Sequence, residues 1–120
     1  MVLGASLNPR RVSYEALARL QLVGEEVVAI GRKAGQVGTV DIQTAAVPVA
    51  DVDTVTIYLS AKNQESYEEY LLEQIRPTRI IFNPGAENPK LAAAAKKLGI
   101  QPIYACTLVM LSTDQYQLAE

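Results

Sequence analysis

A glycine followed by small and polar residues stands near the start of the chain, in the segment Gly4-Ala5-Ser6-Leu7-Asn8-Pro9. Gly4 lets the backbone turn sharply and lets a ligand approach it closely, because glycine has no Cβ. Free backbone N–H groups in such a turn, with a helix starting just beyond, favour an anion. The same residues also fit an ordinary strand-to-helix turn, so the sequence leaves both interpretations open.

Two basic residues, Arg32 and Lys33, closely follow the apolar run Val27–Ile30. In dinucleotide-binding folds, an acidic residue near the end of the second strand holds a ribose hydroxyl, whereas a basic residue accepts a phosphate. The pair therefore argues against NAD and favours a ligand with an additional phosphate on its ribose. A solvated pair of surface charges remains the alternative interpretation.

A third segment, Asn83-Pro84-Gly85-Ala86-Glu87-Asn88, follows the apolar run Ile80–Phe82. Pro-Gly suits a type II turn with the glycine at the position of positive φ. Asn88 followed by Pro89 is typical of a helix start. The turn and the cap do not account for the polar side chains of Asn83 and Glu87.

The residue types that are absent exclude several chemistries. The chain has no histidine and one cysteine, Cys106. This excludes Ser-His and Cys-His catalysis, histidine metal sites and an internal disulfide. Cys106 is expected to be a small apolar residue, although a place at a helix N-terminus would lower its pKa. We predict no catalytic residue and no metal site.

Short apolar runs alternate with segments of helical spacing along the whole chain. This alternation predicts an α/β fold of the Rossmann-like type, a three-layer sandwich whose mostly parallel sheet has five or six strands. Residues 31–38 are interpreted as a glycine-rich basic loop, and Val47-Pro48-Val49 as a short edge strand or a connector. Ligands of such sheets bind outside the carboxyl ends of the strands, where the strand order reverses.

Length and charge restrict the kind of partner. The chain has 120 residues, which predicts a single domain over residues 1–120. With 11 basic and 13 acidic residues the net charge is −2, so nucleic acid is not an expected partner. The sequence lacks an apolar run near the ~20 residues of a membrane span, and we expect a cytoplasmic protein.

Taken together, the segments resemble the small CoA-binding proteins. Gly4-Ala5-Ser6-Leu7-Asn8-Pro9 with Ser13-Tyr14 follows their opening pattern, and the strand ending in Ile30-Gly31-Arg32-Lys33 resembles their second strand. Asn83-Pro84-Gly85-Ala86-Glu87-Asn88 resembles their P-G-A-x-N element, and Cys106 stands where they carry a late cysteine. Those proteins are Rossmann-like domains similar to the CoA-binding domain of the succinyl-CoA synthetase α subunit. The synthetase works through a phosphohistidine, which this chain cannot form.

The resemblance implies a parallel sheet and a site for coenzyme A. Our first hypothesis is a protein that binds CoA or an acyl-CoA without catalysis of its own. In that site the pyrophosphate would lie on the first loop, and the ribose 3′-phosphate and adenosine would meet the basic pair. The residues after the middle strand would touch the nucleotide or the pantetheine, and those after the fourth strand would line the pantetheine arm. The residues implied, in this order, are Gly4, Ala5, Ser6 and Asn8; Arg32 and Lys33; Ser60 and Ala61; and Asn83, Pro84 and Gly85, with Cys106 near the far end of the arm.

Two other functions remain open. The basic pair would equally serve the 2′-phosphate of NADP in a regulatory or redox module. The chain would instead be an interaction protein with a vestigial ligand site if its apolar surfaces pair subunits in a homodimer. Candidate surfaces are the face that carries Tyr67 and Tyr70, and the run Leu108-Val109-Met110-Leu111.

Overall fold

A computed structural model describes residues 1–117 of the chain, so the last three residues of the expected domain lie outside the described part. Within it, seven strands form one sheet in the order β3-β4-β2-β1-β5-β6-β7. All neighbouring strands are parallel except β3 and β4, which pair antiparallel at one edge. The strands are β1 (Val2–Ala5), β2 (Ala29–Gly31), β3 (Gly35–Val37), β4 (Val40–Gln43), β5 (Thr54–Ile57), β6 (Arg79–Phe82) and β7 (Gln101–Tyr104).

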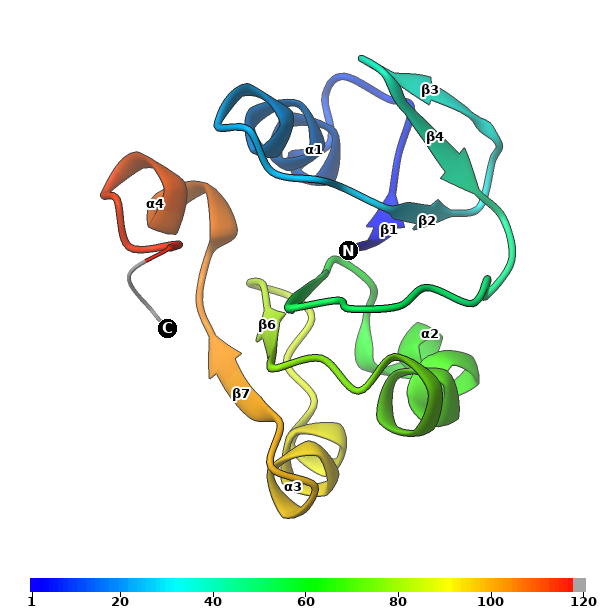
Figure 1. The fold of residues 1–120 in the computed structure, drawn as a ribbon, viewed down its shortest axis with the longest axis vertical. Coiled ribbons are helices and arrows are strands. Elements are labelled where there is room, and N and C mark those ends of the chain that lie inside the picture. The colour runs from blue at the N-terminus through cyan, green and yellow to red at the C-terminus, as the bar shows by residue number, and fades with distance from the viewer. Residues whose placement is uncertain (118–120) are drawn as a thin grey trace.

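Helices cover both faces of the sheet, with α1 (Val12–Leu22) and α4 (Thr107–Ser112) on one side (Figure 1). The other side carries α2 (Ala61–Gln64), the 3₁₀ turn η1 (Glu65–Tyr67), the π-helical η2 (Tyr70–Ile75) and α3 (Pro89–Lys97). In the part of the chain that the structure describes, no helix is both long and apolar enough to cross a membrane.

The two faces of the sheet build two hydrophobic cores, because successive side chains of a strand point to opposite sides. In β1, Val2 packs in the core with Leu17 of α1, while Leu3 packs in the core with Leu71 and Leu91. These side chains are fully buried. The expectation of a Rossmann-like fold with helices on both sides of a mostly parallel sheet is confirmed.

The sheet has more strands than the five or six expected, because residues 35–43 form a hairpin where the sequence indicated a loop. Gln21 of α1 holds this hairpin in place. Its Nε2 donates to the Val37 carbonyl at 3.0 Å, and its Oε1 accepts from the Thr39 backbone N–H at 3.1 Å. The strands are only three and four residues long, so their alternation was too brief to recognise.

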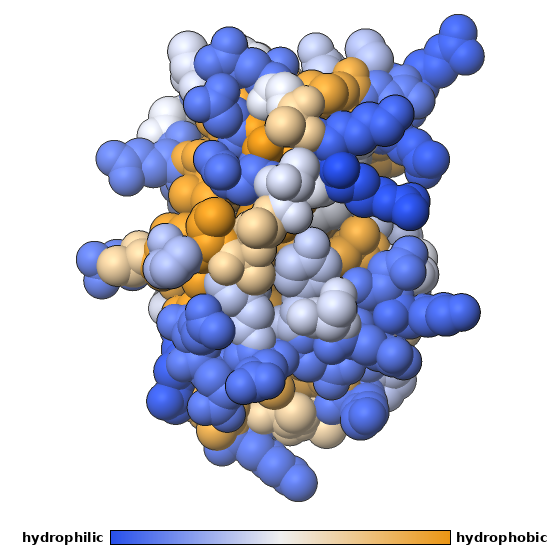
Figure 2. All heavy atoms as spheres, turned by 90° about the vertical axis from the view of Figure 1, so that its right-hand side faces the viewer, coloured by the Kyte–Doolittle hydropathy of each residue, from blue (hydrophilic) through white to orange (hydrophobic). Residues whose placement is uncertain are grey.

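Residues 44–53 connect the hairpin to β5 without regular structure, so Val47-Pro48-Val49 is a connector and not a strand. The hydroxyl of Tyr70 in η2 donates to the Val47 carbonyl and ties this connector to the helices beside it. Val49 and Val52 pack against the core. Figure 2 shows a hydrophobic band between projecting hydrophilic side chains on the side of the molecule that carries the hairpin and α2.

Candidate functional site

The strand order reverses at β1, which pairs with β2 on one side and with β5 on the other. The carboxyl ends of β1 and β5 therefore flank the place where such sheets bind ligands. Gly4 lies at this place with a φ of +95°. The sequence predicted it in the loop after the first strand, but β1 continues to Ala5, and its pairing with β2 is irregular between Leu3 and Ala5. A Cβ at Gly4 would lie 3.2 Å from the Leu59 side chain and 3.2 Å from the Tyr58 backbone. The position has little room for a side chain, and its conformation is one that side-chain-bearing residues rarely adopt.

The loop after β1 turns back on itself through its own polar side chains. Ser6 Oγ accepts the backbone N–H of Asn8 at 3.0 Å, and Asn8 Oδ1 accepts the backbone N–H of Arg10 at 3.0 Å. Arg10 and Arg11 are exposed beside these residues. These two arginines were not predicted as site residues, although a basic pair in a loop after a strand is the same signal as Arg32 and Lys33.

The turn between β2 and β3 places Arg32 and Lys33 beside the loop after β1. Both side chains are exposed. Ala5, the last residue of β1, pairs with Gly31, and a Cβ at Gly31 would collide with the Ala5 carbonyl oxygen. This close approach brings the basic pair and the first predicted loop to the same edge of the sheet.

Ser60 and Ala61 begin α2 directly beyond β5 and share that edge. Ser60 is the exposed N-cap, and its Oγ accepts the backbone N–H of Asn63 at 3.4 Å. Gln64, which was not among the predicted site residues, is fully buried. Its Nε2 donates to the Leu59 and Ala86 carbonyls, each at 2.8 Å, so it joins the loops after β5 and β6. A glutamine within a polar helical segment gives no sequence signal of such a role.

Asn83 lies at the end of β6 and is 2% exposed. Its Nδ2 donates to Thr56 Oγ1 at 2.7 Å and to the Ile57 carbonyl at 2.9 Å. Its Oδ1 accepts the backbone N–H of Thr107 at 2.8 Å. The amide group therefore holds β5, β6 and α4 together, and it faces the interior of the protein.

Pro84 and Gly85 are exposed in the turn that follows Asn83, and Gly85 has the positive φ, +93°, that the sequence predicted. Glu87 Oε1 accepts the backbone N–H of Gly85 at 2.9 Å, which gives this carboxylate a structural role in the turn. Asn88 caps α3 with Pro89 in its first turn, as predicted.

Cys106 is the half-buried N-cap residue of α4 and is a free thiol. The Tyr58 hydroxyl lies near Cys106, Thr56 and Thr107, and burial raises the pKa of Tyr58. Since α4 has six residues, its N-terminus offers only a small helix dipole. Among residues 1–117, no group of three or more histidine, cysteine, aspartate or glutamate side chains could hold a metal ion.

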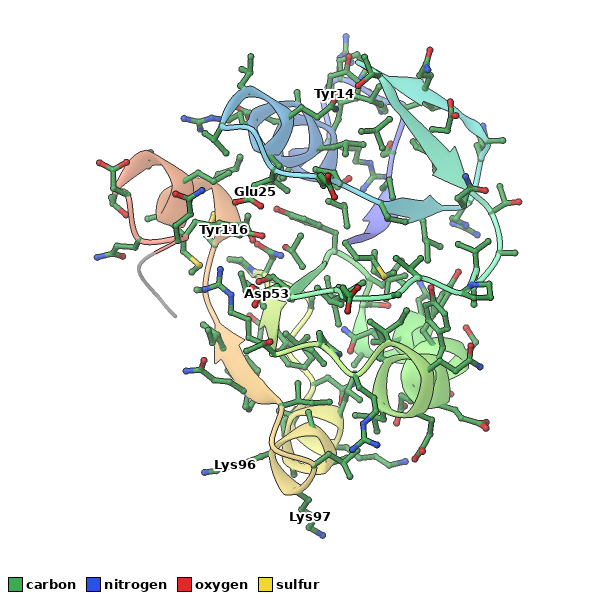
Figure 3. The ribbon with its side chains drawn as sticks, in the orientation of Figure 1. Tyr14, Glu25, Asp53, Lys96, Lys97 and Tyr116 are labelled. Carbon is green, nitrogen blue, oxygen red and sulfur yellow. The ribbon has the colours of Figure 1, made fainter. Side chains whose placement is uncertain are left out.

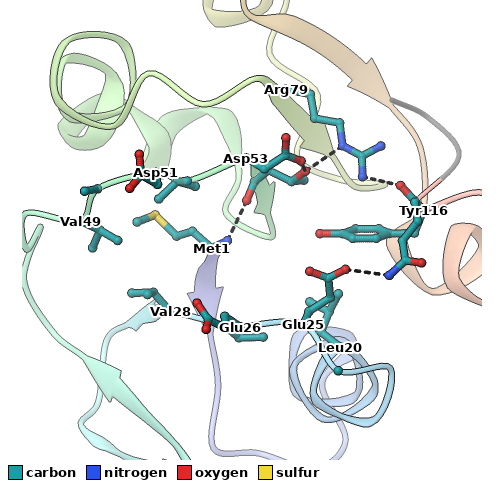
Figure 4. A pocket seen from close by; sticks show the side chains of 16 residues that line it. Met1, Leu20, Glu25, Glu26, Val28, Val49, Asp51, Asp53, Arg79 and Tyr116 are labelled. Atoms are coloured by element: carbon teal, nitrogen blue, oxygen red, sulfur yellow. Dashed lines mark hydrogen bonds between the residues drawn. The ribbon is translucent and has the colours of Figure 1, made fainter.

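A cavity of about 450 Å³ lies at the opposite edge, where β1, β5 and β6 begin (Figure 4). Four carboxylates line it, those of Glu25, Glu26, Asp51 and Asp53. Its arginine, Arg79, is 3% exposed and lies over the ring of Tyr116, 4.7 Å from the ring centroid. The carboxylates make this edge unfavourable for phosphate groups, whereas the edge with the predicted site carries exposed basic side chains. The basic residues in the loops after β1 and β2 and in the first turn of α2 are Arg10, Arg11, Arg32, Lys33 and Lys62.

The topology and the glycine at the strand-order reversal define an α/β protein of the Rossmann-like class. The chain belongs to the CoA binding domain family, whose model matches residues 1–112. This confirms the resemblance that the sequence segments indicated, and it supports a CoA-binding role in general terms.

Solved structures share the fold. The crystal structure of an uncharacterized protein is 41% identical, with a TM-score of 0.92 over 96% of this chain and 94% of that chain. A protein from Thermus thermophilus is 18% identical, with a TM-score of 0.82 over 96% and 87% of the two chains. A hypothetical protein from Pyrococcus horikoshii is 18% identical, with a TM-score of 0.79 over 93% and 80%. No curated protein matches the chain.

Proposed function

We propose that this protein binds coenzyme A or an acyl-CoA at the edge of the sheet where β1, β2 and β5 end, and that it catalyses no reaction of its own. One observation carries the proposal. Gly4, near the carboxyl end of β1, lies at the strand-order reversal, on the same edge as the exposed pair Arg32 and Lys33. A pyrophosphate needs close approach to backbone N–H groups, and a ribose phosphate needs a nearby cation.

The charge distribution supports a polyanionic ligand at this edge. The basic side chains of the loops after β1 and β2 attract phosphates, and the carboxylates at the opposite edge repel them. Arg10 and Arg11 add to the field at the site, and the exposed Ser60 supplies a hydroxyl beside it.

The absence of catalysis is proposed on the residue types present. The chain has no histidine, the Asn83 amide is engaged in the interior, and Glu87 holds the turn at Gly85. We therefore assign binding roles to residues 4–6 and to the pair Arg32 and Lys33. We assign no residue a role in bond making or breaking.

The first experiment identifies the ligand. The purified protein is denatured, the small molecules it releases are identified by mass spectrometry, and the emptied protein is titrated with CoA, dephospho-CoA and NADP by calorimetry. We expect CoA to bind at least about tenfold more tightly than dephospho-CoA, because a charge-assisted hydrogen bond is worth roughly 1.5–3 kcal/mol. Equal affinities would remove the role of Arg32 and Lys33, and a preference for NADP would overturn the assignment to CoA.

A matched pair of double variants separates a specific role from general electrostatics. Arg32→Ala with Lys33→Ala should weaken CoA binding by tenfold or more and dephospho-CoA binding much less. The control is Lys96→Ala with Lys97→Ala, which removes the same net charge from the end of α3, where both side chains point away from the fold (Figure 3). Equal losses in both variants would contradict a specific phosphate contact. If the protein binds none of these ligands but forms a dimer in light scattering, the interaction role replaces the proposal.

A further inference from the structure

A large apolar side chain, Leu7, is 38% exposed in the middle of the loop after β1. It does not lie over empty space. A Cβ added to Gly35 of β3 would stand 2.6 Å from Leu7 Cδ1 and 2.7 Å from Leu7 Cδ2. The side chain of Leu7 therefore rests directly on the backbone of Gly35, and one of its faces remains open to solvent.

Leu7 lies among the polar and basic residues of the proposed site. Leu7 stands between Ser6 and Asn8 in the first loop. Gly35 follows the exposed turn that carries Arg32 and Lys33. The ends of β1 and β2 are held together by the pairing of Ala5 with Gly31. An apolar surface thus lies beside basic groups at one edge of the sheet.

A nucleotide has a matching division of chemistry, with a flat apolar base beside charged phosphates. Binding sites for such ligands combine an apolar contact surface with a few polar groups that fix the orientation. We infer that the open face of Leu7, seated on Gly35, is the surface on which the adenine base of bound CoA lies. Leu7 is then a specificity-determining residue for the nucleoside half of the ligand. This inference rests on the proposed CoA-binding function.

A substitution at Gly35 offers a second way to test the role of Leu7. Any side chain at this position would displace Leu7, because the nearest atoms are the two ends of the Leu7 side chain. Gly35 is not one of the glycines with a positive φ, so an alanine at this position brings little backbone strain. Gly35→Ala therefore changes the place of Leu7 while keeping its chemistry, which Leu7→Ala does not.

The test uses two fragments of the ligand beside CoA itself. Adenosine 3′,5′-bisphosphate carries the nucleoside half, and 4′-phosphopantetheine carries the other half. We expect Leu7→Ala to weaken CoA and the bisphosphate by the same factor, about fivefold to tenfold, because apolar contact area is lost. Gly35→Ala should act in the same direction. Binding of 4′-phosphopantetheine should not change in either variant.

Leu22→Ala is the matched control, since Leu22 is 84% exposed at the end of α1 and far along that helix from the loop. It should leave all three affinities unchanged. If the protein binds CoA and Leu7→Ala either has no effect or weakens 4′-phosphopantetheine instead, the inference is wrong and the proposed function stands. If the unaltered protein binds neither CoA nor the bisphosphate, both fall together.

Discussion

The backbone N–H of Thr107 donates to Oδ1 of Asn83 at 2.8 Å, which joins the first residue of α4 to the end of β6. The hydroxyl of Thr107 lies 2.8 Å from that of Thr56 in β5, and Asn83 Nδ2 donates to the same Thr56 oxygen. All three residues are buried. Because buried polar groups are costly when unpaired, this network fixes how β5, the end of β6 and the start of α4 lie relative to one another.

Asn83→Ala should destabilise the protein strongly. The substitution leaves the Thr107 N–H without an acceptor and the Ile57 carbonyl without the Nδ2 donor in a buried place. We expect the free energy of unfolding to fall by roughly 2–4 kcal/mol in urea denaturation. Asn63→Ala is the control, because Asn63 is exposed and only its backbone takes part in the cap of α2. A loss at Asn83 no larger than the loss at Asn63 would contradict a structural role for the amide.

Arg79, at the beginning of β6, holds the segment that follows α4. Arg79 lies over the Tyr116 ring, 4.7 Å from its centroid, and Arg79 Nη2 donates to the Tyr116 carbonyl. Tyr116→Leu removes the ring and should cost roughly 1–3 kcal/mol of stability, because the buried guanidinium loses a cation–π partner and packing. Tyr116→Phe keeps the ring and should cost less than about 1 kcal/mol. Equal losses in the two variants, measured by thermal unfolding, would show that the ring does not stabilise Arg79.

Most of the architecture could be predicted from local patterns in the sequence. The apolar runs of β2, β5 and β6 and the cap formed by Asn88 with Pro89 are local signals, and local signals predicted the order of elements. The hairpin of residues 35–43 was missed because its pairing depends on contacts with β2 and with Gln21, which lie far along the chain. Contacts between segments far apart in the chain cannot be predicted from local patterns.

In the candidate site, the places of the predicted residues relative to the sheet follow from local patterns, while their ligand contacts stay predictions. Gly4 and the pair Arg32 and Lys33 lie on one edge, as the positions after strands imply. Asn83 was predicted to line a ligand, and its amide instead faces three protein partners. Whether an asparagine after a strand turns inward or outward is decided by tertiary neighbours, so the sequence does not reveal it.

Buried tyrosines predict a loss of stability at alkaline pH. Burial raises the pKa of Tyr58 and of Tyr116 above the ordinary value of 10.0. In the unfolded chain these phenols ionise near pH 10, whereas in the folded protein they stay neutral to higher pH. Their contribution to stability is therefore complete below pH 10 and is lost as the pH rises through the folded-state pKa values.

The measurement compares unfolding free energies between pH 8 and pH 11 in the unaltered protein and in Tyr58→Phe. We expect stability to fall less steeply above pH 10 in the variant, and tyrosinate absorbance at 295 nm to lose part of its late-titrating amplitude. Identical slopes in the two proteins would show that ionisation of Tyr58 is not linked to folding.

Gly4→Ala should impair both folding and ligand binding, for two separable reasons. The first is conformational, since a φ of +95° costs an alanine roughly 1–2 kcal/mol. The second is spatial, since its Cβ would stand 3.2 Å from both Leu59 and Tyr58. Gly24→Ala is the matched comparison, because Gly24 has a φ of +86° and a Cβ there meets no atom within 4 Å. We expect Gly4→Ala to lose more stability than Gly24→Ala by about 1–3 kcal/mol, the usual range for an overpacked site.

At a temperature where both variants are folded, CoA affinity should fall only in Gly4→Ala, because Gly24 lies at the opposite edge of the sheet beside the acidic cavity. Equal stability losses would show that Leu59 and Tyr58 yield freely to the new methyl group, and equal CoA affinities would place the ligand away from Gly4.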